Sequence, residues 1–207
     1  MKRFFTINVF IILLTVNAFS QIGIRIGVNS AQQIRTFIDH PANFTTDKLT
    51  GFQAGLVWQS KFGKSGFGTE IGALFTQKGS FYNYTDNSIS VEKFDELNYV
   101  SVPFNIRFMP PISSPVNLYG TGGIYFSYLL SGKTTDETNN SSEKMTFRSV
   151  TERMDVGVSA GGGVQLLGKI QLGITWNWGF MHTPLSTSDF IKNFKNRDFS
   201  VNLTYVF

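Results

Sequence analysis

Strict alternation of apolar residues with small or polar ones is the feature of this sequence that most restricts its fold. In the last segment, one face carries Phe199, Val201, Leu203, Tyr205 and Phe207. The opposite face carries Ser200, Asn202 and Thr204. Successive side chains of a strand point to opposite sides of a sheet, so a period of two predicts β-structure.

Seven earlier segments repeat this pattern, which gives eight predicted strands in 207 residues. Their apolar faces cover 22–28, 52–58, 67–75, 100–108, 118–128, 154–166 and 170–178. Each segment is close to the ~9–11 residues that a tilted strand needs to cross a membrane.

The connections between these segments alternate in length. The short ones lie near 60–66, 109–115 and 167–169. The long, polar ones lie near 31–49, 79–95, 131–150 and 181–196. Short periplasmic turns and longer outer loops are typical of outer-membrane barrels. The sequence therefore predicts an all-β fold: an eight-stranded antiparallel up-and-down transmembrane β-barrel with both chain ends on the periplasmic side.

A secreted soluble barrel of the lipocalin type would show the same period with its apolar face turned inward. Two features favour the membrane. The small face is rich in Gly and polar groups, which leaves too little apolar bulk for a ligand cavity. The apolar face carries aromatic residues near the strand ends, as expected where amphipathic rings lie at headgroup depth. These are Trp58, Phe67, Phe108 and Tyr205 at the periplasmic level, and Phe52, Phe75, Tyr128, Trp176 and Trp178 at the outer level.

The first 20 residues have the composition of a cleavable secretory signal peptide. Lys2 and Arg3 form a positive start, residues 7–16 are nearly all apolar, and small residues precede Gln21. An N-terminal membrane anchor is the alternative, but this apolar run falls short of the ~20 residues that a spanning helix needs. We expect a signal peptide at 1–20 and an outer-membrane β-barrel domain at 21–207, with no separate periplasmic domain.

Composition argues against several function classes. The chain has no Cys, which rules out a disulfide scaffold, a Cys-ligated zinc site and a catalytic thiol. Charged residues make up 15% of the chain and Lys and Arg form no cluster, so we expect no nucleic-acid partner. We also expect no cofactor and no bound metal.

Four charged residues fall on inward positions of the predicted strands: Arg25, Glu70, Arg107 and Asp155. A charge that faces lipid is costly, so placement in the lumen is expected. The first three lie near the periplasmic ends of their strands. These residues predict a buried ion-pair network that fills the lumen, and the alternative is a selectivity ring in a narrow channel.

The C-terminal residues form a separate signal. Phe207, preceded by the alternating Tyr205, Leu203 and Val201, resembles the recognition signal that the barrel-assembly machinery of gram-negative bacteria reads. We therefore expect Tyr205 and Phe207 to act in assembly.

A catalytic alternative rests on the connection 181–196. His182 has Ser186 and Ser188 just beyond it, and small outer-membrane lipid-modifying enzymes use His and Ser near this level. A Ser nucleophile needs a positioned base and a third orienting group. Asp189 could orient His182, but loop spacing shows no geometry, so we expect no enzyme activity.

The connection 79–95 contains several aromatic and β-branched residues, among them Phe81, Tyr82 and Phe94. It could fold over the mouth of the barrel, which is the interpretation we favour from sequence. It could instead extend the strand pair above the membrane as a protruding hairpin that binds a partner.

The whole of 21–207 resembles the PorT-like "porin family" of outer-membrane β-barrels. The resemblance is carried by the stretches 23–29, 51–55, 70–79, 97–103 and 156–163. It implies an eight-stranded barrel in the outer membrane of gram-negative bacteria and no shared catalytic motif. One member type is linked to type IX secretion and gliding, and no residue here marks this chain as that member.

These observations favour a non-enzymatic outer-membrane barrel with an anchoring, adhesive or envelope-assembly role. Its expected partners are outer-membrane lipid, lipopolysaccharide and the barrel-assembly machinery, with envelope or secretion-complex proteins as further candidates. The rivals are a narrow passive channel and a lipid-modifying enzyme.

Overall fold

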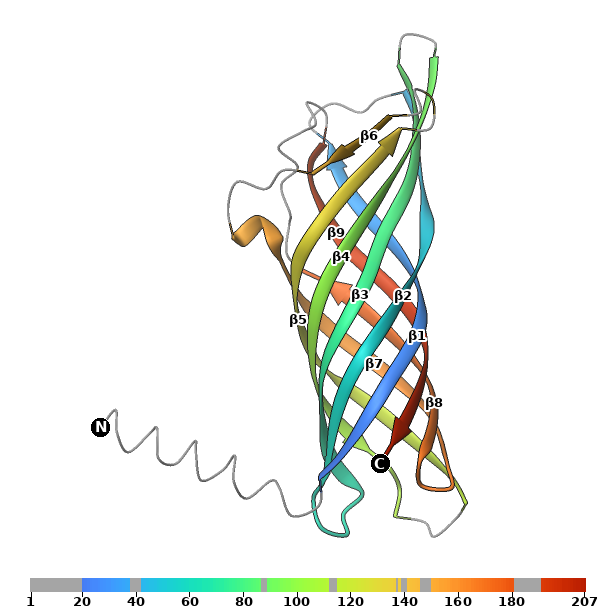
Figure 1. The fold of residues 1–207 in the computed structure, drawn as a ribbon, viewed down its shortest axis with the longest axis vertical. Helices are drawn as coiled ribbons and strands as arrows, with labels where there is room; N and C mark the ends of the chain where they lie inside the picture. Colours follow the sequence, from blue (N-terminus) through green and yellow to red (C-terminus); the bar gives the residue numbers. More distant parts are fainter. Residues whose placement is uncertain are drawn as a thin grey trace, which may run out of the picture.

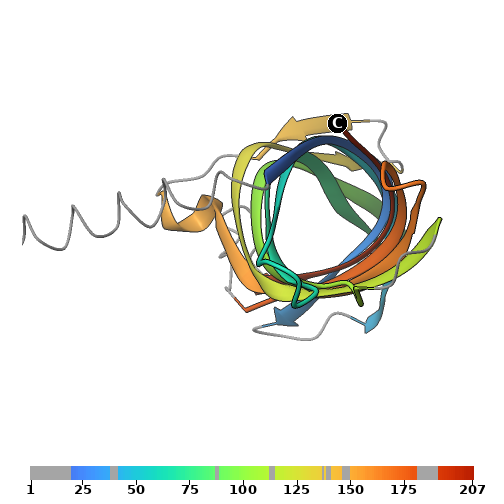
Figure 2. The ribbon, with the colours of Figure 1, turned by 90° about the horizontal axis from the view of Figure 1, so that it is seen from below.

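A computed structural model describes residues 20–37, 42–86, 89–111, 115–136, 138, 141–145, 150–180 and 191–207. These residues form a closed antiparallel β-barrel whose ring is visible end-on (Figure 2). Among them, no helix is long and apolar enough to cross a membrane.

Eight long strands build the barrel wall (Figure 1). They are β1 (Ser20–Phe37), β2 (Ala42–Lys61), β3 (Phe67–Asp86), β4 (Ile89–Phe108), β5 (Val116–Asp136), β7 (Met154–Leu166), β8 (Ile170–Gly179) and β9 (Ile191–Val206). Each pairs antiparallel with its neighbours in chain order, and the pairing of β1 with β9 closes the ring. The predicted eight-stranded up-and-down barrel is therefore confirmed.

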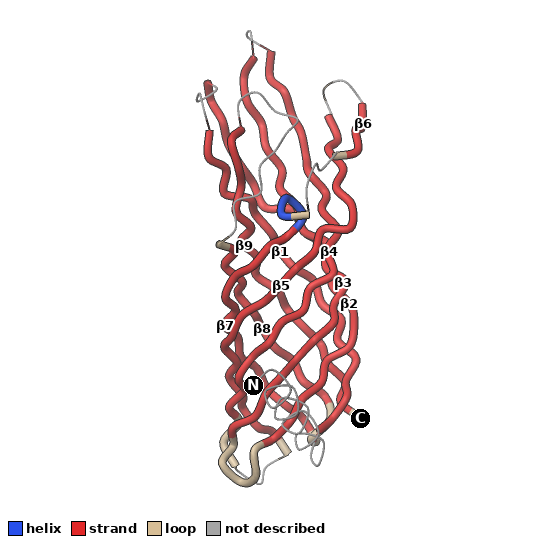
Figure 3. The backbone as a smooth tube through the Cα atoms, turned by 90° about the vertical axis from the view of Figure 1, so that its left-hand side faces the viewer, coloured by secondary structure: helices blue, strands red, loops and turns tan. Residues whose placement is uncertain are grey.

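Two small elements lie outside this ring. The short strand β6 (Ser141–Lys144) pairs with the outer end of β5, and the single-turn helix η2 (Thr151–Arg153) leads into β7. Figure 3 shows β6 beside the far end of β5 and η2 closer to the barrel body.

Tight turns join the strands at one end of the barrel. Between β7 and β8, Leu167 and Gly168 both have positive φ, at 51° and 73°. Two positive φ values match the type I′ hairpin turn, whose twist agrees with that of the flanking strands. The start of β1 and the end of β9 lie at this same end (Figure 1).

The strands are much longer than the sequence predicts. β1 to β5 have 18 to 21 residues each, so most of the predicted long connections 31–49 and 79–95 are strand. β3 and β4 stay paired up to Asp86 and Ile89, which makes the interpretation of 79–95 as a loop over the mouth wrong. Above the membrane, the backbone N–H and C=O groups of paired strands still form hydrogen bonds with each other. The side chains there no longer need to alternate in hydrophobicity, so the sequence pattern does not reveal these strands.

Apolar side chains cover the outside of the barrel and polar ones fill its inside. Leu56 is 56% exposed, whereas Gln59 on the same strand is 4% exposed. One small apolar cluster lies towards the outer part of β4 and β5, where the buried Leu97, Tyr99 and Leu129 pack with Met145. An inward apolar face of the lipocalin type is therefore wrong.

Candidate functional site

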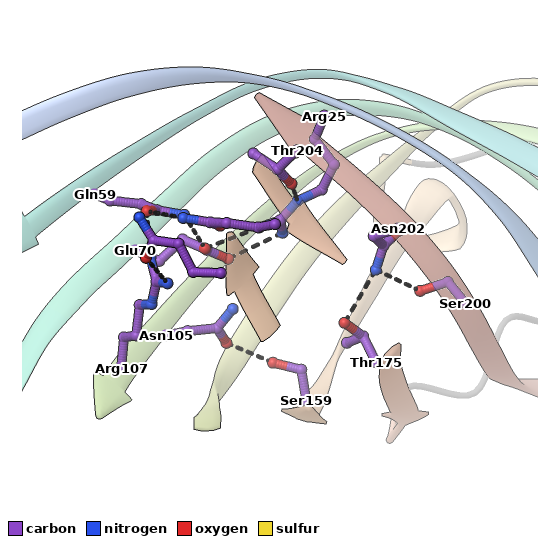
Figure 4. A network of polar contacts seen from close by, with 12 residues as sticks. Arg25, Gln59, Glu70, Asn105, Arg107, Ser159, Thr175, Ser200, Asn202 and Thr204 are labelled. Atoms are coloured by element: carbon purple, nitrogen blue, oxygen red, sulfur yellow. Dashed lines mark hydrogen bonds and ion pairs between the residues drawn. The ribbon is translucent and has the colours of Figure 1, made fainter. Parts of the chain in front are cut away.

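One layer near the turn end of the barrel takes a side chain from every strand of the ring. Figure 4 labels five of these residues: Arg25, Gln59, Glu70, Arg107 and Thr204. The layer, called here the lower network, consists of Arg25, Gln59, Glu70, Arg107, Tyr119, Gln165, Gln171 and Thr204. All eight occupy inward positions of the period of two, and the register between neighbouring strands brings them to one level.

The ion pair between Arg25 and Glu70 is the centre of the lower network. Arg25 Nη1 and Nη2 donate to Glu70 Oε1 and Oε2 at 2.9 and 2.8 Å, a bidentate geometry. Arg25 Nε donates to Thr204 Oγ1 at 2.9 Å, and Gln59 Nε2 donates to Glu70 Oε2 at 2.8 Å. Glu70 is 1% exposed, so these donors replace the water that the carboxylate loses.

Arg107 extends this network across the lumen. Its guanidinium donates to the amide oxygen of Gln59, and Nη2 donates to Gln165 Oε1 at 3.1 Å. The Tyr119 ring lies 4.3 Å from its Cζ, within the range of a cation–π contact. Arg107 thus contacts β2, β5 and β7 at once and ties opposite sides of the wall together.

A second set of charges, the upper network, lies towards the outer end. Lys78 Nζ lies 2.8 Å from Asp198 Oδ1 and 3.5 Å from Asp155 Oδ2. Asn196 Nδ2 donates to Asp155 Oδ2 at 3.0 Å and to Tyr99 Oη at 3.1 Å. The Lys78 ammonium also lies 4.8 Å from the centre of the Tyr125 ring.

The structure corrects the predicted grouping of lumen charges. Arg25, Glu70 and Arg107 lie together, but Asp155 belongs to the upper network with Lys78 and Asp198. Sequence reasoning missed Lys78 because it ended the third segment at 76, although Lys78 continues the inward parity of Glu70 and Thr76. Sequence reasoning also missed Gln165 and Gln171, because it selected charged residues and these amide side chains are neutral.

A small cavity separates the two networks. Its volume is about 40 Å³, and Gln53, Thr76, Ser159, Thr175 and Asn202 are among the residues that line it. That volume holds a few water molecules at most. Hydrogen bonds between Asn105 and Ser159 and between Asn202 and Thr175 cross this level (Figure 4). The described lumen therefore carries polar contacts between strands at three successive levels.

The aromatic residues predicted at the membrane boundaries point outward. Trp58, Trp176 and Trp178 are 46%, 41% and 37% exposed. Neighbouring rings touch at both levels: Phe67 with Phe108 at 4.8 Å near the turns, and Trp176 with Phe199 at 5.0 Å towards the other end. Two outward belts of this kind are the mark of a barrel that spans a bilayer.

The family model of the outer membrane protein beta-barrel domain matches residues 16–183. The chain belongs to this family. It is therefore an outer-membrane β-barrel protein, and its tight turns face the periplasm as they do in such barrels. A sequence comparison with curated proteins found no match.

Several solved structures of outer-membrane barrels resemble the structure of this protein. OprG of Pseudomonas aeruginosa has a TM-score of 0.51 at 12% identity over 91% of this chain and 96% of its own. Ail of Yersinia pestis gives 0.44 at 17% over 91% and 99%, and Neisserial surface protein A gives 0.46 at 11% over 90% and 97%. At such identity the likeness to OprG concerns the fold alone.

The C-terminal residues of the outer-membrane barrel lie on its periplasmic rim. The Phe207 N–H donates to the Ile22 carbonyl at 2.9 Å, and the Tyr205 and Phe207 rings meet edge-on at 5.4 Å. Phe207 is 64% exposed. The residues of the catalytic alternative, His182, Ser186, Ser188 and Asp189, lie outside the described residues.

Among the described residues, no group of three or more His, Asp or Glu side chains is arranged to hold a metal ion. The chemistry of the lumen consists of charge-assisted hydrogen bonds between fixed partners. Such an arrangement ties side chains of different strands together across the lumen.

Proposed function

We propose that this outer-membrane barrel is a non-enzymatic, non-conducting anchor that presents an extended β-rim at the cell surface for adhesive or envelope-assembly contacts. One observation carries the proposal: the lumen is filled by two ionic networks while six of the strands continue far beyond the outer aromatic belt.

The filled lumen argues against a passive channel. Each charged group of the two networks has several polar partners, and the Arg25–Glu70 pair is bidentate. All of these charged residues are at most 7% exposed. Opening a path would require separating such partners inside the barrel, and removing one partner of a buried ion pair typically costs ~3–5 kcal/mol.

The extended rim is the part of the protein that other molecules can meet. Above the belt, β9 and β1 remain paired as far as Ile191 and Phe37, and β3 and β4 as far as Asp86 and Ile89. By contrast, β7 begins at Met154 and β8 ends at Gly179, so among the described residues the strands of the rim are longer on the side of β9 and β1 to β5. A tall, one-sided sheet suits contact with a partner beside the barrel.

The finer expectations from sequence form part of this proposal. Residues 1–20 act as a cleavable signal peptide, and the chain is a PorT-like member of its family. Its partners are outer-membrane lipid, lipopolysaccharide and the assembly machinery, with envelope or secretion-complex proteins at the rim. We also propose that the protein binds no nucleic acid and catalyses no reaction.

Single-channel recording in planar bilayers tests the proposal. We expect the purified wild-type barrel to give no discrete conductance steps, because both networks stay intact. A Glu70→Gln variant, which keeps the side-chain shape, serves as the comparison. Reproducible wild-type steps whose ion selectivity changes in Glu70→Gln would contradict the anchor and support the narrow channel.

A further inference from the structure

A groove lies on the wall of the barrel where β4, β5, β6 and η2 meet. It has a volume of about 400 Å³ and is separate from both lumen networks. Its lining comprises Glu96, Asn98, Leu130, Ser131, Gly132, Lys133, Lys144, Met145 and Arg153. Three cationic side chains therefore face one carboxylate.

The groove begins at the outer boundary of the membrane. Leu130 lies two residues beyond Tyr128 of the outer belt, and both point outward, at 48% and 41% exposure. Lys133 follows five residues after Tyr128, which is at most ~17 Å along a tilted strand. The polar headgroup layer starts where the hydrocarbon core ends. Leu130 and the cations thus span the change from acyl chains to headgroups.

The backbone holds the cations close to one another. Lys133 and Lys144 lie directly opposite in the pairing of β5 with β6, and such like-charge pairs are unfavourable unless an anion lies between them. Glu96 faces Lys133 from the other side in the pairing of β4 with β5, and it compensates only part of this charge. Arg153 Nη1 donates to the carbonyls of Leu129 and Leu130 at 3.2 Å each, which fixes the guanidinium at the groove.

We infer that this groove binds the phosphate of a glycolipid headgroup in the outer leaflet. The ammonium groups of Lys133 and Lys144 supply point charges to the phosphate, and Arg153 adds planar N–H donors. Leu130 contacts the apolar part of the same lipid. Leu130 of the groove lining points outward next to the belt residue Tyr128, which favours a lipid of the surrounding leaflet over an anion from solution. This inference rests on the proposed function, because it gives the lipopolysaccharide partner a binding site, and it does not depend on whether the lumen conducts.

Native mass spectrometry of the purified barrel with added lipid A tests the inference. We expect one lipid A molecule to stay bound to the wild type. A double variant Lys133→Gln/Lys144→Gln should bind at least tenfold more weakly. The matched control Lys61→Gln/Lys64→Gln removes the same charge from exposed positions at the periplasmic end and should bind as the wild type does.

Two further probes separate the sources of the phosphate. Dephosphorylated lipid A should bind as weakly to the wild type as lipid A does to the Lys133/Lys144 variant, and millimolar inorganic phosphate should not displace lipid A. Equal binding by the two double variants would overturn the inference. Unchanged retention of dephosphorylated lipid, or displacement by inorganic phosphate, would overturn it as well.

Discussion

At the residue scale, a single carboxylate organises the lower network. Glu70 accepts hydrogen bonds from Arg25 and Gln59, and Gln59 in turn accepts one from Arg107. Buried charges are tolerated only when paired and hydrogen-bonded, so each of these groups depends on the others. Side chains from opposite walls are thereby joined through one residue of β3.

Removing this carboxylate should destabilise the barrel. We expect Glu70→Ala to cost ~3–5 kcal/mol, because it leaves the Arg25 guanidinium buried without its partner. For a chain of this size, that corresponds to a fall of ~10 °C in the melting midpoint. The loss of the compact, faster-migrating band on heating in semi-native gels measures it.

An exposed carboxylate provides the control. Glu143→Ala in β6 makes the same change of charge at an exposed position and should leave the midpoint unchanged. The pair Arg25→Met/Glu70→Leu should recover part of the loss, since neither buried charge then remains without its partner. If Glu70→Ala melts with the wild type, the network has no structural role.

Small residues make room for the lumen rings. A Cβ added at Gly173 would collide with the Tyr119 hydroxyl, whereas one at Gly163 would collide first with the backbone carbonyl of Leu172 and then lie 2.8 Å from the same hydroxyl. The Tyr119 hydroxyl thus occupies space that the missing side chain of Gly173 leaves free. At Gly120, which faces outward, the nearest atom would be 4.0 Å away.

Gly173→Ala should therefore reduce stability by ~1–3 kcal/mol through overpacking. Tyr119→Phe added to it should restore most of the loss, because the hydroxyl is the atom in conflict. Gly120→Ala is the matched control and should fold as the wild type does. Urea titration followed by tryptophan fluorescence compares the four proteins, and a double variant no better than Gly173→Ala would refute the packing argument.

At the element scale, several strands extend beyond the part of the barrel that spans the membrane. In β3 the belt residue Phe75 is followed by eleven more strand residues up to Asp86, and β4 pairs with them throughout. The Phe81 and Phe94 backbones lie opposite each other in this ribbon. The hairpin is thus a rigid extension of the wall, and hydrogen bonding to a neighbour continues where the membrane no longer dictates the side chains.

The position of this hairpin can be tested on intact cells. An epitope inserted after Asp86 should be labelled by antibody without permeabilisation, because the β3–β4 ribbon projects from the outer end. The same epitope inserted after Gly63, in the tight turn between β2 and β3, should be labelled only once the outer membrane is opened. The reverse pattern would contradict the assigned orientation.

At the scale of the whole molecule, closure depends on the two ends of the barrel domain. β1 pairs with β2 on one side and with β9 on the other, from Gly23 opposite Val206 to Phe37 opposite Ile191. A barrel closed in this way leaves no strand edge in lipid, where an unpaired backbone group would be costly. The pairing of β9 with β1 therefore completes the ring.

Phe207 should matter more for assembly than for stability. Its ring is exposed at the periplasmic rim and only its N–H bonds to β1. We expect Phe207→Ala to lower the amount of barrel in the outer membrane several-fold in cells. After refolding in detergent, the same variant should melt within about 2 °C of the wild type. Normal insertion in cells would count against the assembly signal.

The sequence by itself determined the strands, their number and which side of each faces the lumen. Period-two alternation is a local property, and it placed Arg25, Glu70 and Arg107 inward and Trp58 and Trp176 outward without knowledge of any neighbour. The amphipathic contrast between a lipid-facing and a lumen-facing side made the pattern strong within the bilayer.

Only the tertiary structure decided the register between neighbouring strands, and with it which lumen side chains contact each other. Whether Asp155 meets Arg25 or Lys78 depends on how far each strand is shifted against the next around the ring, and no single segment encodes that shift. The length of the strands beyond the belt was also undecided, because Asp86 and Ile89 are strand residues through pairing with each other. Sequence thus specified which face each residue occupies, and closure of the barrel specified what it touches there.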